Sequence, residues 1–145
     1  MATSLNLLDS RFRPLAEDLI AQYEASTRER LRIITTGRTP EEQAQALKNK
    51  TSWTKNSKHL PQPPEGKSLA IDLCPPQYLT IKEWNPTGAL WWTLAEIAVS
   101  LGLRSGMDWN DKGLPRLGVV RPHWDPGHSE MRIVVPSLSD IQPIT

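Results

Sequence analysis

Three short segments hold nearly all the side chains of this chain that could bind a metal and do chemistry there. They are residues 57–59, 70–72 and 123–128, and they contain all three histidines of the 145-residue sequence. Zinc in a catalytic site takes three protein ligands from histidines and carboxylates and keeps a fourth position for water. A nearby carboxylate then acts as general base on that water. The sequence offers one such set, with Asp125 as the base and three ligands: His59, Asp72 and His128.

The third ligand and the base have alternatives. His123 and Asp125 form a second spacing that fits a metal, and His128 would then lie outside the site. We favour His128 because it adjoins a predicted strand over 130–135 that would hold its ring, whereas His123 lies in an irregular segment. Asp125 precedes Pro126-Gly127, a strong turn signal, so its carboxylate could instead cap a turn or bind the metal itself.

The elements expected to position these groups begin with a helix and a strand. Apolar residues from Phe12 to Tyr23 recur at three-and-four spacing, which predicts an amphipathic helix. Residues 31–36 are rich in β-branched side chains and predict a strand. Residues 39–42, Thr-Pro-Glu-Glu, have the pattern of a capping box and predict a second helix that continues through residue 47.

A long polar loop over 49–67 leads to the strand expected to carry Asp72. Residues 68–73 alternate strictly between apolar and small or polar types, so the apolar members point to the core and Asp72 points to the other face of the sheet. His59 lies within the loop. The loop must therefore fold back to bring His59 beside Asp72.

The rest of the pattern indicates an α+β fold. A helix is expected over 87–101, followed by an irregular stretch over 104–127 with several Gly and Pro residues, and then by the closing strand over 130–135. Helices and strands follow one another without a regular βαβ rhythm. We therefore expect a small antiparallel sheet with helices packed on it and the zinc site on its open face.

Length and composition indicate a single domain over 1–145, with a core of about residues 8–135 and a loose C-terminal tail. The 17 basic and 16 acidic residues give a net charge of +1, which does not favour a nucleic-acid partner. The only cysteine, Cys74, excludes an internal disulfide and is expected to pack in the core. Residues 1–9 do not resemble a signal peptide, and no apolar window suggests membrane insertion. We expect a monomer that is made in the cytoplasm.

The three segments resemble the motifs of zinc metallopeptidases that cut bacterial wall peptides. This group includes D-Ala-D-Ala carboxypeptidases and dipeptidases and the L-alanyl-D-glutamate peptidases found as phage endolysins, and it shares a fold with the Hedgehog signalling domain. Two further segments resemble the family, Gly-Arg-Thr-Pro-Glu-Glu-Gln at 37–43 and Gly-Met-Asp-Trp at 106–109. Together the matches cover the chain from about residue 33 to residue 134.

The resemblance implies a role for each candidate residue. His59, Asp72 and His128 would bind Zn²⁺, Asp125 would be the catalytic base, Arg38 would bind substrate or stabilise the oxyanion, and Ser57 would support the site. An alternative for Arg38 is a structural salt bridge to Glu41, Glu42 or Asp72. Two departures from the family pattern concern the substrate subsite and the choice between His123 and His128. An insertion within 60–67 separates the first two ligands, and an extra segment over 116–124 precedes Asp125, with Ser129 where the family has an aromatic residue.

These observations predict a zinc-dependent peptidase that hydrolyses peptidoglycan stem peptides at the L-Ala–D-Glu bond, as a phage-type endolysin. Such an enzyme would reach the cell wall once the membrane is disrupted. The nearest alternative is a D-Ala-D-Ala carboxypeptidase, and a second class is a non-catalytic zinc-binding module, such as a virion structural part. Asp125 discriminates between the classes, because a structural zinc needs no base beside an open position.

Overall fold

The computed structural model describes residues 2–49, 57–79, 88–119, 121 and 123–132, and its architecture is the expected α+β fold. In this part of the chain the strands form one antiparallel sheet in the order β1-β2-β4-β3. The strands are β1 (Arg32–Thr35), β2 (Ala70–Cys74), β3 (Arg104–Ser105) and β4 (His128–Glu130). The helices are α1 (Arg13–Thr27), α2 (Pro40–Lys48) and α3 (Ala89–Ser100), with 3-10 turns η1 (Leu5–Leu7) and η2 (Pro76–Tyr78).

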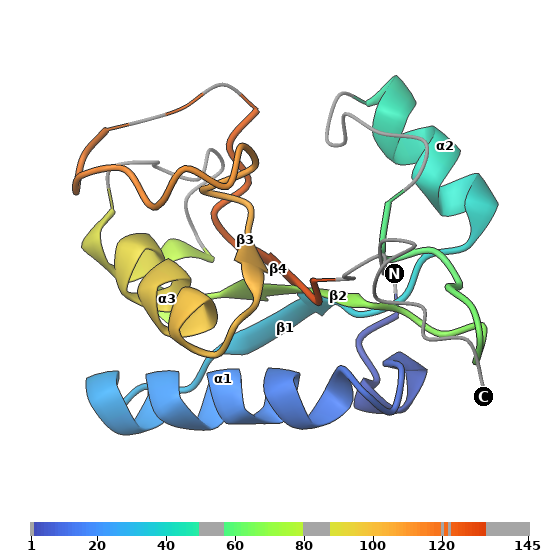
Figure 1. Ribbon diagram of the computed structural model, residues 1–145, viewed down its shortest axis with the longest axis horizontal. Coiled ribbons are helices and arrows are strands. Elements are labelled where there is room, and N and C mark those ends of the chain that lie inside the picture. Colours follow the sequence, from blue (N-terminus) through green and yellow to red (C-terminus); the bar gives the residue numbers. More distant parts are fainter. Residues whose placement is uncertain (1, 50–56, 80–87, 120, 122, 133–145) are drawn as a thin grey trace, which may run out of the picture.

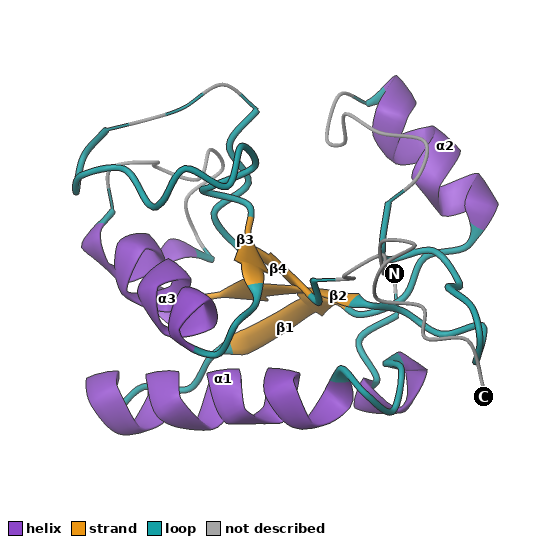
Figure 2. Cartoon of the chain, viewed as in Figure 1, coloured by secondary structure: helices purple, strands orange, loops and turns teal. Residues whose placement is uncertain are grey.

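The helices α1 and α3 pack on one face of the sheet, and they leave the other face open. Figure 1 shows α1 running below the sheet with α3 beside it, while α2 and the chain that follows β3 lie on the opposite side. The sheet itself is small and surrounded by long loops, as Figure 2 shows. No helix in the described segments is long and apolar enough to cross a membrane.

The hydrophobic core lies between α1, α3 and the apolar side of β2. The alternation along residues 69–73 sends Leu69, Ile71 and Leu73 into this core, as expected. Cys74 also packs there, and burial raises the pKa of its thiol to about 11. The helices contribute one buried stripe each, which consists of Ala16, Leu19 and Tyr23 on α1 and Trp91, Leu94, Ala95 and Ala98 on α3.

The first two predicted helices are confirmed, including the local signals at their ends. In α2 the hydroxyl of Thr39 accepts from the Glu42 amide at 3.1 Å, and the Glu42 carboxylate accepts from the Thr39 amide at 3.0 Å. This is the capping box that the sequence predicted. α1 ends where Arg28 adopts a positive φ of 60° and its amide closes on the Glu24 carbonyl.

The C-terminal half of the sheet differs from the sequence prediction. The stretch expected to be irregular contains β3, and the closing strand begins at His128 rather than at residue 130. Pairing explains the shift, because β4 is anchored at His128 opposite Asp72, whereas the apolar run that suggested a later start lies mostly at 133–135, outside the described residues. The expected C-terminal tail lies outside them as well.

Candidate metal centre

Strand register brings Asp72 and His128 together. The two residues are direct partners in the antiparallel pairing of β2 with β4. Directly opposite residues on neighbouring strands project their side chains to the same face. Because Ile71 and Leu73 point into the core, Asp72 points away from it, and His128 joins it there. The Nδ1 atom of His128 lies 3.1 Å from Oδ1 of Asp72.

The loop before β2 folds back and places His59 at the same point. The Gln62 amide donates to the Lys67 carbonyl at 2.9 Å, which closes the inserted segment on itself. The Leu69 amide then donates to the Lys58 carbonyl at 2.9 Å. The hydroxyl of Ser57 accepts from the His59 amide at 3.2 Å, so Ser57 supports the turn that presents His59.

The imidazole of His59 is buried and held from both sides of its ring. Its Nδ1 lies 3.0 Å from the carbonyl oxygen of Thr36, which can only accept, so Nδ1 carries the proton and donates. The opposite nitrogen, Nε2, lies 3.1 Å from Oδ2 of Asp72. Nε2 therefore points directly at a carboxylate oxygen, and either a proton or a metal ion held by the two atoms makes such a contact favourable.

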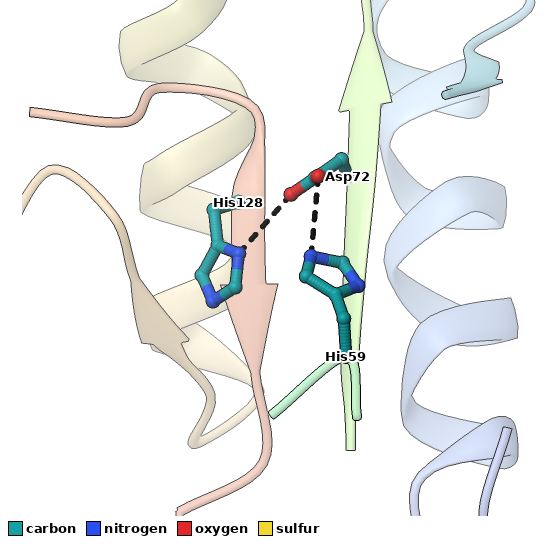
Figure 3. Close-up of side chains that lie close together, drawn as sticks. All are labelled: His59, Asp72 and His128. Atoms are coloured by element: carbon teal, nitrogen blue, oxygen red, sulfur yellow. Dashed lines mark hydrogen bonds and ion pairs between the residues drawn. The ribbon is translucent and has the colours of Figure 1, made fainter. Parts of the chain in front are cut away.

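Together the three side chains form a cluster that can hold a metal ion. Figure 3 shows His59 and His128 converging on the carboxylate of Asp72 from a loop and from β4. One ligand atom from each residue lies within 4.8 Å of the others, and all three residues are buried. Two imidazole nitrogens and one carboxylate are the ligands that catalytic zinc takes, with a fourth position left for water. The residues present therefore fit the metal.

The charges of the cluster support the same conclusion. Burial opposes ionisation of Asp72, but the two imidazoles hold its pKa well below the ordinary value. Burial also opposes the charged form of His128, but the carboxylates of Asp72 and Glu130 raise its pKa to about 10. The carboxylates of Asp72 and Glu130 therefore place negative charge at this site, which a cation can balance.

Asp125 reaches the cluster from the turn that precedes β4. Its carboxylate Oδ2 lies 3.9 Å from Nδ1 of His128, and its side chain is 38% exposed, so it stands at the rim of the centre. Partial burial and the negative charge of Asp72 raise the pKa of Asp125 to about 6. A carboxylate in this position lies close to the three candidate ligands and is still accessible to a bound substrate.

Gly106 allows this turn to pass close to β3. The Gly106 carbonyl accepts from the Asp125 amide at 2.9 Å, and the Gly106 amide donates to the His128 carbonyl at 2.8 Å. A Cβ atom at residue 106 would lie 2.0 Å from the Asp125 carbonyl oxygen, a distance no real contact allows. Glycine is thus required at this position, and it holds the Asp125 turn against the sheet.

Two other candidates lie in contrasting places. Arg38 lies at the centre, where its Nη2 is 3.5 Å from Oδ2 of Asp72 and its Nη1 donates to Gln43 at 3.0 Å. The alternative of a salt bridge to Asp72 is therefore present in the structure.

His123 is exposed, has a positive φ of 57° and is not part of the three-residue cluster. Its carbonyl accepts from the Trp109 ring at 2.8 Å.

One residue of the centre was missed from the sequence. Glu130 is buried, and its Oε1 lies 2.8 Å from Nε2 of His128, on the side of the ring opposite Asp72. Residues two apart on a strand share a face. The signal was therefore present in the pattern His128-x-Glu130, but a strand that starts at residue 130 does not include the histidine.

A pocket of about 260 Å³ adjoins the centre between the first turn of α2 and the inserted loop. Its lining includes His59 of the cluster and two cations, Arg38 and Lys67. The lining also includes the carboxylate residue Glu42, so the pocket places charges of both signs beside one of the candidate ligands.

Comparison with known proteins agrees with this geometry. The family described as phage L-alanyl-D-glutamate peptidase matches the chain over residues 2–132. Among solved structures, the crystal structure of the L-Ala D-Glu endopeptidase ChiX of Serratia marcescens is similar, with 16% sequence identity and a TM-score of 0.55. That similarity covers 88% of this chain and 83% of the other, and at this identity it shows the fold. No curated protein matches the chain.

Proposed function

Because the chain belongs to the phage L-alanyl-D-glutamate peptidase family, we propose that it is a zinc-dependent peptidase that hydrolyses the L-Ala–D-Glu bond of peptidoglycan stem peptides. The observation that carries the proposal is the buried convergence of His59, Asp72 and His128, with a partly exposed carboxylate at its rim. All four residues lie within the segment that matches the family.

Zinc would be held by His59, Asp72 and His128. When bound, it supplies a Lewis acid that polarises the scissile carbonyl and lowers the pKa of water toward neutrality. The chain's own contribution is to orient the ligand side chains. The Thr36 carbonyl holds the ring of His59 by its Nδ1–H group, so the other ring nitrogen is free to bind a metal.

Asp125 is the proposed general base. Its carboxylate accepts a proton from the attacking water and then delivers that proton to the amine that leaves when the peptide bond breaks. A pKa of about 6 suits both steps, because a base works best when its pKa lies near the operating pH. Partial exposure lets the same oxygen reach a bound substrate from the rim of the centre.

Arg38 and the adjoining pocket are proposed to bind the substrate. The guanidinium, next to Asp72, brings a positive charge to the place where the carbonyl oxygen of the substrate becomes negative. Arg38 and Lys67 also give the pocket two cations that can pair with the carboxylates of a stem peptide, and Glu42 in the same lining can pair with an amino group. We further propose that the protein acts as an endolysin, on cell walls that membrane disruption has exposed.

Digestion of purified sacculi tests this proposal. Mass spectrometry should detect free L-alanine carboxyl ends and new D-glutamate amino ends, and a chelator should abolish their formation. Loss of terminal D-alanine instead would identify a D-Ala-D-Ala carboxypeptidase. If no bond is cut while zinc is bound, the protein is a non-catalytic zinc-binding module.

Substitution of the proposed base provides the matched test. Asp125→Ala should retain zinc and lose activity by about 10²–10⁴-fold, the usual contribution of a general base. Asp18→Ala, which removes an exposed carboxylate of α1, is the control and should keep full activity. Equal activity of the Asp125 variant and the control would contradict the assignment of the base.

A further inference from the structure

Glu130 is a buried carboxylate that the proposed mechanism does not use. It is the last residue of β4, lies two positions after His128, and is only 5% exposed. A buried carboxylate is costly unless charged and hydrogen-bonding partners compensate it. Here the compensation comes from the ring of His128 and from the Lys58 ammonium, whose Nζ lies 2.7 Å from Oε2, with the Arg104 guanidinium farther away at 3.9 Å.

The contact with His128 determines which ring nitrogen faces the cluster. An ionised carboxylate only accepts, so Nε2 of His128, 2.8 Å from Glu130, carries a proton and donates it. Nδ1 is then the nitrogen that faces Asp72, 3.1 Å away, and it can bind a metal that displaces its proton. His59 is held in the same manner by the Thr36 carbonyl, but at the opposite nitrogen of its ring.

Lys58 connects the two segments that carry the histidines. It directly precedes His59 in the folded-back loop, and its ammonium donates both to Glu130 and to the Met131 carbonyl at 3.0 Å, at the end of β4. The side chain of Lys58 is 24% exposed, so solvent screens this ion pair only in part. The pair therefore ties the His59 loop to the strand of His128.

We propose that Glu130 and Lys58 are positioning residues of the metal centre. Glu130 fixes the ring of His128 with Nε2 protonated and Nδ1 directed to the metal, and Lys58 holds the Glu130 carboxylate in place. This inference rests on the proposed function and adds two residues to its ligands, base and substrate-binding groups. It predicts that Glu130 and Lys58 strengthen zinc binding although neither residue contacts the metal.

Zinc affinity of the purified protein tests the inference. The dissociation constant, measured by competition with a chromogenic chelator, should rise about 10–100-fold in Glu130→Ala, the typical cost of losing the partner of a ligand histidine. Glu130→Gln should fall between this variant and the wild type, because an amide oxygen still accepts from Nε2 but forms no ion pair. Lys58→Met should weaken binding by about tenfold, at the lower end of the same range.

Matched controls remove the same chemical groups from exposed positions. Glu96→Gln on α3 and Lys48→Met on α2 change one charge each at the surface and should bind zinc as the wild type does. If Glu130→Ala does not fold, Glu130→Gln and Lys58→Met decide the outcome. The inference is overturned if both of these bind zinc within twofold of the wild type.

A second measurement separates positioning from mere stabilisation. The chain has three histidines, so the ¹⁵N signals of labelled imidazoles in the zinc-loaded protein can be assigned by substitution. In the wild type, His128 should show a protonated Nε2, and Glu130→Ala should change this pattern without altering that of His59. A purely structural role would lower the melting temperature and leave both the zinc affinity and the His128 signals unchanged. A wild type that binds no zinc would overturn the proposed function as well, whereas normal binding by the variants would overturn only this inference.

Discussion

The two faces of β2 differ in what surrounds their side chains: one faces an apolar core and the other a cluster of ionisable groups. Leu73 and Ile71 point into a layer of side chains from α1 and α3, where fit and apolar contact decide stability. Asp72, between them in sequence, points to the other face, where two imidazoles and the Arg38 guanidinium surround its carboxylate. The apolar face therefore keeps the sheet folded. The polar face gathers several ionisable side chains around one carboxylate.

The comparison teaches how a costly cluster is tolerated. Removing the Asp72 carboxylate and the two imidazoles from water is costly unless they compensate one another. The apolar core on the reverse side of the same strand stabilises the sheet that carries them. Substitutions on the two faces should accordingly separate metal binding from stability.

The largest effect is expected on the polar face. His59→Ala, Asp72→Ala and His128→Ala each remove one of three proposed zinc ligands and should leave the purified protein largely without zinc and without activity. His123→Ala should keep its zinc, because this exposed residue lies outside the cluster. Metal content, measured by elemental analysis of the four variants at equal protein concentration, checks the expectation. Zinc lost from His123→Ala but kept by His128→Ala would reverse the assignment of the third ligand.

A smaller effect, of a different kind, is expected one residue away. Leu73→Ala opens a cavity in the core and should lower the free energy of unfolding by about 2–5 kcal/mol. Its zinc content per folded molecule should stay at the wild-type value, because the substituted side chain points away from the centre. Urea denaturation followed by zinc analysis of the folded fraction measures both quantities. A variant that folds normally but binds no zinc would show that the two faces are not independent.

The smallest effect concerns pH and the polar face alone. In the metal-free protein the pKa of His128 is raised to about 10, so at neutral pH its Nδ1 carries a proton that zinc must displace. The free state then binds more protons than the zinc-bound state, and zinc affinity should rise with pH, by up to about tenfold per unit below that pKa. Calorimetry at pH 7 in buffers of different ionisation enthalpy should detect the released proton. Binding heats that do not depend on the buffer would contradict this account.

Local patterns in the sequence already determined much of the fold. The three-and-four spacing before residue 23, the capping box at 39–42 and the alternation of 68–73 each depend on neighbours a few residues apart, and α1, α2 and β2 form where these patterns predict. The same alternation aimed Asp72 away from the core, because side chains on a strand must point to opposite faces in turn. The residue types that bind zinc could also be identified from the sequence, because zinc accepts only a few kinds of side chain as ligands.

Tertiary structure alone decided how these groups meet. Pairing of β4 with β2 set the start of the last strand at His128, and only with that start does the spacing His128-x-Glu130 put both residues on one face. Fold-back of the loop brought Lys58 to Glu130 and His59 to Asp72, across separations in sequence that only long-range contacts can bridge. The sequence thus determined which residues could form the centre, and packing of the strands and loop determined their distances and partners, because such contacts depend on the whole chain.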